Sequence, residues 1–231
     1  MDYEQARFNM VEQQIRTWDV LDQQILDLLF EVKREEFVPA AFRTLAFADL
    51  ELPLADSQTG VGRADAFPST GGQRMWSPKM EARVLQSLNL KRRESVLEIG
   101  TGSGYFAALL GHRAGSVTSV EIDPRLSASA ATRLARMRNG NVRCEVGDAA
   151  RGWGNEPYDA IVLTGSTPIL PESFFAQLKP GGRIFAIVGE APVMTARLVS
   201  WTAPGSRVTT DLFETVVAPL VNAATPARFQ F

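Results

Sequence analysis

The chain has 231 residues, of which 22% are charged and 45% hydrophobic, and its formal net charge is −2. This length and composition predict a soluble globular protein with one large domain, or one domain and a small lobe, and the small net charge gives no electrostatic reason to expect a nucleic-acid partner. A single cysteine, Cys144, excludes an internal disulfide, and with only one histidine, His112, the chain lacks the usual ligands of a zinc site, so we expect no metal.

The amino-terminal third combines helical segments with a long connection. Helical periodicity marks segments around 4–16, 22–31 and 40–47. Residues 51–78 are rich in Gly, Pro and Asp, and a connection of this length in a compact protein is usually functional. A further helix is predicted over 79–90. The chain starts with MDYEQARF, without the basic and then apolar order of a signal peptide, and no apolar run approaches about 18 residues, so we expect a cytoplasmic protein without a membrane partner.

A glycine-rich turn, E-x-G-x-G-x-G from Glu98 to Gly104, joins a short apolar segment to a segment with helical spacing. Its glycines permit positive φ and let a ligand approach the backbone closely. In an open α/β sheet, the turn at the carboxyl end of the first strand is where nucleotide-like ligands bind. A dinucleotide fingerprint would need its third glycine at Tyr105, which disfavours an NAD-dependent oxidoreductase. The acid at Glu98 would repel a diphosphate but attract the ammonium of a ligand that carries an amino acid, which favours S-adenosylmethionine.

Two further predicted strands end in acids that suit the same ligand. Glu121 ends a strand over 117–121, about 20 residues past the first glycine, where such folds place a carboxylate on ribose hydroxyls. Asp148 follows a strand over 142–147, at a position where a carboxylate can meet the adenine amino group. The predicted cofactor-binding residues are therefore Glu98, Gly100, Thr101, Gly102, Gly104, Glu121, Asp148 and Ala149.

Strands and helices alternate over the second half of the chain. The expected strands lie near 95–100, 117–121, 142–147, 158–164 and 183–188, and the expected helices near 104–113, 124–138 and 171–178. This alternation predicts an α/β fold of Rossmann-like, doubly wound type, with a mostly parallel sheet and helices on both faces. Segments 196–201 and 207–219 predict a carboxyl-terminal antiparallel strand pair. We expect an amino-terminal helical and substrate-side part, 1–78, packed on a cofactor-binding core, 79–231, in one structural domain.

Several stretches stand in a specific order: VLEIGTGSGYFAALL, SVEIDPRLSASAATRL, NVRCEVGDAARGW and PYDAIVLTGSTPILPESFFAQLKPGGRIFAIVG, preceded by REEFVP at 34–39 and by Gly72-Gln73 before Pro78. In order and spacing they resemble the protein-L-isoaspartate O-methyltransferases, which are class I S-adenosylmethionine-dependent methyltransferases. The resemblance covers almost the whole chain. It implies a protein-repair enzyme that methyl-esterifies isoaspartyl carboxylates in damaged proteins and peptides.

The substrate loop departs from this family. The family loop reads approximately G-Q-T-I-S-Q-P, with its threonine and serine near the acceptor carboxylate, whereas this chain reads Gln73, Arg74, Met75, Trp76 and Ser77 after Gly72. Arg74 aligns with the threonine and Trp76 with the serine. A tryptophan supplies no hydroxyl, and its bulk would occupy part of a small acceptor pocket. The segment 55–70 is also longer than the family's equivalent.

Each substituted residue has two interpretations. Ser77 can replace the missing hydroxyl after a one-residue shift, which makes it the candidate catalytic residue, or it is a turn residue before Pro78. Arg74 either pairs with an acceptor carboxylate or is a solvated loop cation. Trp76 is either a core residue under the loop or the wall of an altered acceptor site. The missing hydroxyls predict weak transfer to a standard isoaspartyl peptide.

The sequence therefore does not decide which molecule accepts the methyl group. An isoaspartyl protein or peptide is the acceptor that the resemblance implies. The alternatives are another carboxylate acceptor or a small molecule for a methyltransferase of the same fold, and a noncatalytic protein that binds S-adenosylmethionine. Transfer to a carboxylate needs no strong base, because the nucleophile is already ionised near neutral pH, so the absence of a catalytic dyad excludes none of these readings. The oligomeric state is not predicted.

Overall fold

The computed structural model describes residues 2–54, 72–137, 140–203 and 206–226. The segment 55–70, which is longer than the family's equivalent, lies outside the described residues. Within the described ranges, no helix has both the length and the apolar character needed to cross a membrane.

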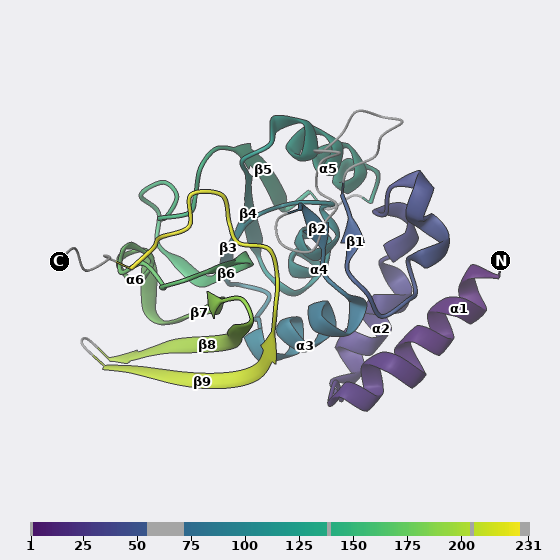
Figure 1. The fold of residues 1–231 in the computed structure, drawn as a ribbon, viewed down its shortest axis with the longest axis horizontal. Coiled ribbons are helices and arrows are strands. Elements are labelled where there is room, and N and C mark those ends of the chain that lie inside the picture. The colour runs from purple at the N-terminus through teal and green to yellow at the C-terminus, as the bar shows by residue number, and fades with distance from the viewer. Residues whose placement is uncertain (1, 55–71, 138–139, 204–205, 227–231) are drawn as a thin grey trace.

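A seven-stranded sheet forms the centre of the molecule, in the order β5-β4-β3-β6-β7-β8-β9 (Figure 1). Its strands are β3 (Ser95–Ile99), β4 (Ser116–Glu121), β5 (Val142–Val146), β6 (Tyr158–Thr167), β7 (Leu178–Glu190), β8 (Val193–Ala203) and β9 (Ser206–Thr215). The pairs from β5 to β7 are parallel, and β8 and β9 add antiparallel strands at one edge. The predicted sheet and its carboxyl-terminal antiparallel pair are therefore confirmed.

The strand order places a ligand site beside β3. From β3 the chain moves outward through β4 to β5 and then returns to β6 on the other side of β3. Ligands of open α/β sheets bind where the order reverses in this way, outside the carboxyl ends of the strands.

Alternate residues of the strands face two separate apolar clusters. In β3, Val96 belongs to one cluster, whereas Leu97 and Ile99 belong to the other. Because both faces of a parallel sheet are covered, such strands read as nearly continuous apolar runs. The first cluster packs against α3 (Pro78–Leu88), α4 (Tyr105–Arg113) and α5 (Pro124–Arg136), and the second against the short α6 (Ser173–Ala176).

The amino-terminal segments are helical but less regular than periodicity predicts. The expected helix over 4–16 begins as α1 (Tyr3–Asn9), continues as π-helical turns η1 (Met10–Ile15) and ends in the 3-10 turn η2 (Arg16–Trp18). The helix α2 (Gln23–Glu31) follows, then the 3-10 turns η3 (Arg34–Glu36) and η4 (Ala40–Leu45). Periodicity reports which residues are buried, but it does not distinguish these hydrogen-bonding patterns.

Buried ion pairs join these segments to the core. Arg7 pairs with Glu35, and Arg34 pairs with Glu81 of α3. Arg34 also donates to the Ala46 carbonyl at 2.9 Å and to the Trp76 carbonyl at 2.6 Å. One apolar cluster contains residues from both sides of position 78, so the two expected parts share a core.

Local expectations in the second half need correction. The helix expected over 171–178 contains four residues, because β7 already begins at Leu178. The strand expected near 183–188 begins earlier, at Leu178, and contains an irregularity where Gly181 has φ of 80° and the pairing jumps from Leu178 to Arg183. Cys144, in β5, is half-buried. Burial, with the nearby charge of Glu98, raises the pKa of the Cys144 thiol to about 11.

Candidate functional site

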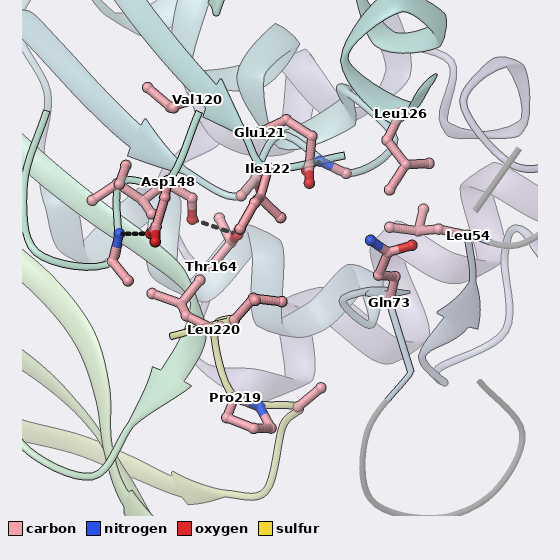
Figure 2. A pocket seen from close by; sticks show the side chains of 18 of the residues that line it. Leu54, Gln73, Val120, Glu121, Ile122, Leu126, Asp148, Thr164, Pro219 and Leu220 are labelled. Atoms are coloured by element: carbon pink, nitrogen blue, oxygen red, sulfur yellow. Dashed lines mark hydrogen bonds between the residues drawn. The ribbon is translucent and has the colours of Figure 1, made fainter. Parts of the chain in front are cut away.

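A cavity of about 150 Å³ lies at the carboxyl ends of β3, β4, β5 and β6 (Figure 2). Each strand end contributes to it, and Leu54, Gln73, Leu126 and a carboxyl-terminal segment complete the wall. It brings together the predicted site residues Gln73, Arg74, Gly100, Gly102, Glu121, Asp148 and Ala149. The remaining predicted residues lie elsewhere, as described below.

The glycine turn presents bare backbone to this cavity. Gly100 has φ of 97°, and a Cβ on it would stand 2.2 Å from Oγ1 of Thr164. Thr164 is fixed there because its hydroxyl donates to the carbonyls of Ile99 and Gly100 at 2.8 and 2.7 Å. Gly104 differs: it does not line the cavity, and a Cβ on it would lie 3.0 Å from the Cβ of Ala130 in α5. Gly104 therefore permits α4 to pack on α5.

Glu121 is held by backbone amides at the end of β4. Its Oε2 accepts from the Gly102 amide at 2.8 Å, and its Oε1 accepts from the Asp123 amide at 3.1 Å. Burial raises the pKa of the Glu121 carboxyl, and these two amides oppose that rise. A carboxylate offers about four lone-pair sites, so capacity remains toward the cavity, where hydroxyl groups can donate to it. Figure 2 shows Glu121 and Gln73 pointing into the cavity from different elements.

Asp148 connects the end of β5 with the carboxyl-terminal segment. Its Oδ1 accepts from the Ala150 amide at 3.0 Å, and its Oδ2 accepts from Nδ2 of Asn222 at 2.8 Å. The segment is held on the sheet by Ser166, whose amide donates to the Ala218 carbonyl and whose carbonyl accepts from the Leu220 amide. Ala218, Pro219, Leu220 and Val221 line the cavity, but the sequence offered no motif for them, because their place depends on a long-range contact with β6.

Glu98 and Trp76 line a separate small cavity of about 30 Å³ behind the glycine turn, together with Met75, Thr101 and other residues. Glu98 is fully buried and accepts a hydrogen bond from Oγ of Ser119, which in turn lies 2.6 Å from Oγ1 of Thr101. Burial raises the pKa of the Glu98 carboxyl to about 8. Trp76 is 5% exposed and meets Phe106 and Phe185 edge-on. It is therefore a core residue under the loop.

A larger groove of about 630 Å³ adjoins the first cavity. The two share Gly72, Arg74, Ala218, Pro219 and Leu220, and the groove adds Glu51, Ser166, Met194 and Asn222 among its walls. Arg74 stands in β2 (Arg74–Met75), which pairs with β1 (Leu52–Pro53), and its Nη1 donates to the Glu51 carbonyl at 3.3 Å. Trp76 does not line this groove, so its bulk does not fill an acceptor site there.

Ser77 lines neither cavity nor the groove. It is the N-cap residue of α3, and its carbonyl accepts from the amides of Met80 and Glu81 at 3.1 Å each. This placement matches its interpretation as a turn residue and does not favour the shifted hydroxyl.

Comparisons with known proteins agree on one family. The model of protein-L-isoaspartate(D-aspartate) O-methyltransferase (PCMT) matches residues 5–225. A protein-L-isoaspartate O-methyltransferase of Rhodopseudomonas palustris is 41% identical over 181 residues, which are 78% of this chain and 76% of the relative. Protein-L-isoaspartate O-methyltransferase 2 of Anaeromyxobacter is 37% identical over 206 residues, which are 88% of this chain and 79% of the relative.

Solved structures show the same fold. A protein-L-isoaspartate O-methyltransferase has a TM-score of 0.74 at 25% identity, and the match covers 92% of this chain and 65% of the solved chain. A Plasmodium falciparum protein described as a protein-L-isoaspartate O-methyltransferase, solved with S-adenosyl-L-homocysteine, has a TM-score of 0.74 at 15% identity and covers 96% of this chain and 99% of its own.

Proposed function

Because the chain belongs to the protein-L-isoaspartate O-methyltransferase family, we propose that it transfers a methyl group from S-adenosylmethionine to the isoaspartyl carboxylate of a damaged protein or peptide. The observation that carries the proposal is the position of Arg74, which lines both the cavity at the strand ends and the adjoining groove. A reaction between a cofactor and a separate acceptor requires two sites that meet at one place, and the shared wall at Arg74 is such a place.

The residues of the first cavity suit S-adenosylmethionine. Glu121 and Asp148 are carboxylates, which accept hydrogen bonds from ribose hydroxyls and from the adenine amino group but would repel a diphosphate. Oε1 of Gln73 is buried without a hydrogen-bond partner in the described part of the chain, and Gln73 lines this cavity. Gly100 and Gly102 line the cavity without side chains, so the methionine portion can approach their backbone closely.

The chain contributes positioning rather than proton transfer. When bound, S-adenosylmethionine supplies an electrophilic methyl group on a sulfonium. A carboxylate acceptor is ionised near neutral pH and needs no base, so the protein has to hold it in line at about 3 Å. We assign that task to Arg74, because a guanidinium grips both oxygens of a carboxylate. The Pro219–Leu220 segment lines cavity and groove alike and so forms part of their shared wall.

Other features belong to the same proposal. Residues 1–78 would supply the substrate side and 79–231 the cofactor core, and the protein would act in the cytoplasm. Another carboxylate acceptor is the second candidate, favoured by Arg74 standing where the family has a threonine. Ser77, at the N-cap of α3, keeps no role in our proposal.

Methyl transfer to a synthetic isoaspartyl peptide tests the proposed function. The assay follows radiolabelled methyl from S-adenosylmethionine into a base-labile ester, with the matching aspartyl peptide as control. The missing family hydroxyls predicted weak transfer, but Trp76 does not line the groove and we assign the positioning of the carboxylate to Arg74 instead. We therefore expect the native chain to methylate the isoaspartyl peptide and not the aspartyl one. S-adenosylhomocysteine binding without any transfer to the isoaspartyl peptide would favour the other-acceptor alternative instead.

A further inference from the structure

The small cavity behind the glycine turn adjoins the proposed cofactor cavity. Arg74, Gly100, Gly102 and Thr164 line both, and the small cavity adds Trp76 and Glu98, among others. Its volume is about 30 Å³, so it can take only the polar end of a ligand whose larger part lies in the adjoining cavity. The methionine portion of a cofactor that follows the glycine turn would reach this cavity with its end.

Two buried polar atoms belong to the residues that line this small cavity. Nε1 of Trp76 and Oε1 of Glu98 have no hydrogen-bond partner among the described residues, although both side chains are at least nine-tenths buried. Buried polar groups in proteins are normally paired, so each such atom calls for a partner. The indole N–H only donates, and an ionised carboxylate only accepts. A water molecule can pair with both atoms, and so can an α-amino acid group, with its carboxylate as acceptor and its ammonium as donor.

The sequence already predicts that Glu98 accepts from the ammonium of the cofactor's amino-acid end. We propose that Trp76 donates its indole N–H to the α-carboxylate of that same end. The inference rests on the proposed function, because it assigns the second part of the same cofactor site. It makes Trp76, which replaces the family serine, a cofactor-binding residue rather than a wall of the acceptor site.

The surroundings of Trp76 hold the indole in place for this role. Nη2 of Arg34 donates to the Trp76 carbonyl at 2.6 Å, and the ring centroids of Phe106 and Phe185 lie 5.5 and 5.9 Å from that of the indole. Other charged groups also line the cavity. Glu81 is paired with Arg34, and Arg74 is a second candidate to bind the α-carboxylate. An experiment must therefore separate Trp76 from Arg74.

Titration calorimetry with two ligands isolates the carboxylate contact. The ligands are S-adenosylhomocysteine and its decarboxylated analogue, in which hydrogen replaces the α-carboxylate. Trp76→Phe removes the N–H and keeps an aromatic ring. We expect it to weaken S-adenosylhomocysteine binding roughly ten- to hundredfold, the range for losing a hydrogen bond to a charged group, and to leave binding of the decarboxylated analogue unchanged. Glu98→Gln should weaken both ligands, because both retain the ammonium.

Control variants distinguish the proposed contact from the alternative explanations. Trp201→Phe removes an indole from the apolar cluster on the opposite face of the sheet and should change neither affinity. Arg74→Gln should not abolish the preference for the ligand with the carboxylate. If that preference is lost in Arg74→Gln and kept in Trp76→Phe, Arg74 binds the carboxylate and the inference is wrong. Equal effects of Trp76→Phe on both ligands, or none on either, would show that Trp76 only fills the core.

A second measurement keeps Trp76 itself and does not depend on a Trp76 variant that folds. The indole N–H of Trp76 should show a downfield proton shift in a nitrogen–proton NMR spectrum when S-adenosylhomocysteine is added, and a much smaller shift with the decarboxylated analogue. The signal is assigned by substituting the other three of the four tryptophans. An unchanged Trp76 signal at saturation with S-adenosylhomocysteine contradicts the inference. Failure of the native chain to bind S-adenosylhomocysteine at all would instead overturn the proposed cofactor itself.

Discussion

Replacing Glu121 by glutamine tests the proposed ribose contact with little change of shape. The native carboxylate accepts from two backbone amides, those of Gly102 and Asp123. Glutamine offers one oxygen for two donors, so its amide group must face one of the two N–H groups. An unpaired buried donor costs about 1–3 kcal/mol, and we expect the free energy of unfolding to fall by that amount. The protein should stay folded.

The same substitution weakens the hydrogen bonds that a bound ribose would donate. Exchanging a charged acceptor for a neutral one at a buried site costs about 1–3 kcal/mol, which is roughly fivefold to over a hundredfold in the dissociation constant of S-adenosylhomocysteine by calorimetry. Asp123→Asn is the matched control. Asp123 caps α5 through the Arg125 amide at 2.9 Å and does not line the cavity, so affinity should not change. Equal affinities of the native chain and Glu121→Gln would mean that Glu121 only organises the glycine turn, and the reasoning would be refuted.

Further predictions concern the glycine turn, the buried acid and the acceptor side. Gly100→Ala would place a Cβ 2.2 Å from Oγ1 of Thr164, so it must displace the turn or this cavity-lining side chain, and it should lower both stability and S-adenosylhomocysteine affinity. Gly154→Ala, at φ of 63° with nothing within 4 Å, should cost about 1 kcal/mol of stability and no affinity. Calorimetry and thermal melting show whether the two variants differ, and an unchanged affinity of Gly100→Ala would contradict the proposed site. Burial raises the pKa of the Glu98 carboxyl to about 8; the hydrogen bond from Ser119 opposes this rise, and the charges of Glu121 and Glu81 add to it. An ammonium bound beside Glu98 favours the ionised carboxylate, so Glu98 releases a proton on binding and S-adenosylhomocysteine affinity should rise from about pH 6 to 8. An affinity that does not depend on pH in this range would contradict the contact. Because of the same raised pKa, Glu98 binds more protons in the native chain than in the unfolded chain between about pH 4.5 and 8, so its contribution to the free energy of unfolding should fall as pH rises through that window. Glu98→Gln should remove this pH dependence in denaturant titrations. Arg74→Gln should raise KM for an isoaspartyl peptide at least tenfold with little change in S-adenosylhomocysteine affinity, and an unchanged KM would remove Arg74 from the acceptor site.

The sequence signals for the cofactor side are local. The glycines of the turn and the acids at Glu121 and Asp148 stand directly after buried strands, and parallel strand ends meet at one edge of a sheet. The structure brings Gly100, Gly102, Glu121 and Asp148 to one cavity. Gly104 illustrates the limit: the spacing marks it as part of the turn, but only the packing of α5 shows that it meets Ala130 instead of the cavity.

The acceptor side was less predictable because it depends on contacts between distant segments. The alignment placed Trp76 at the family serine, but its burial against Phe106 and Phe185 follows from how the loop lies on α4 and β7. Likewise, Asn222 reaches Asp148 because its segment pairs with β6, which no periodicity or motif near residue 222 indicates.

A structure of the chain with S-adenosylhomocysteine and an isoaspartyl peptide tests the central claim most directly. The measured quantity is the distance from the cofactor sulfur to the isoaspartyl carboxylate. We predict that adenosine lies between Glu121 and Asp148, that the peptide lies in the groove beside Met194 and Asn222, and that its carboxylate meets Arg74 within about 5 Å of the sulfur, since the methyl lies between them. A peptide bound outside this groove, or a carboxylate held away from Arg74 and the sulfur, would contradict the proposed function.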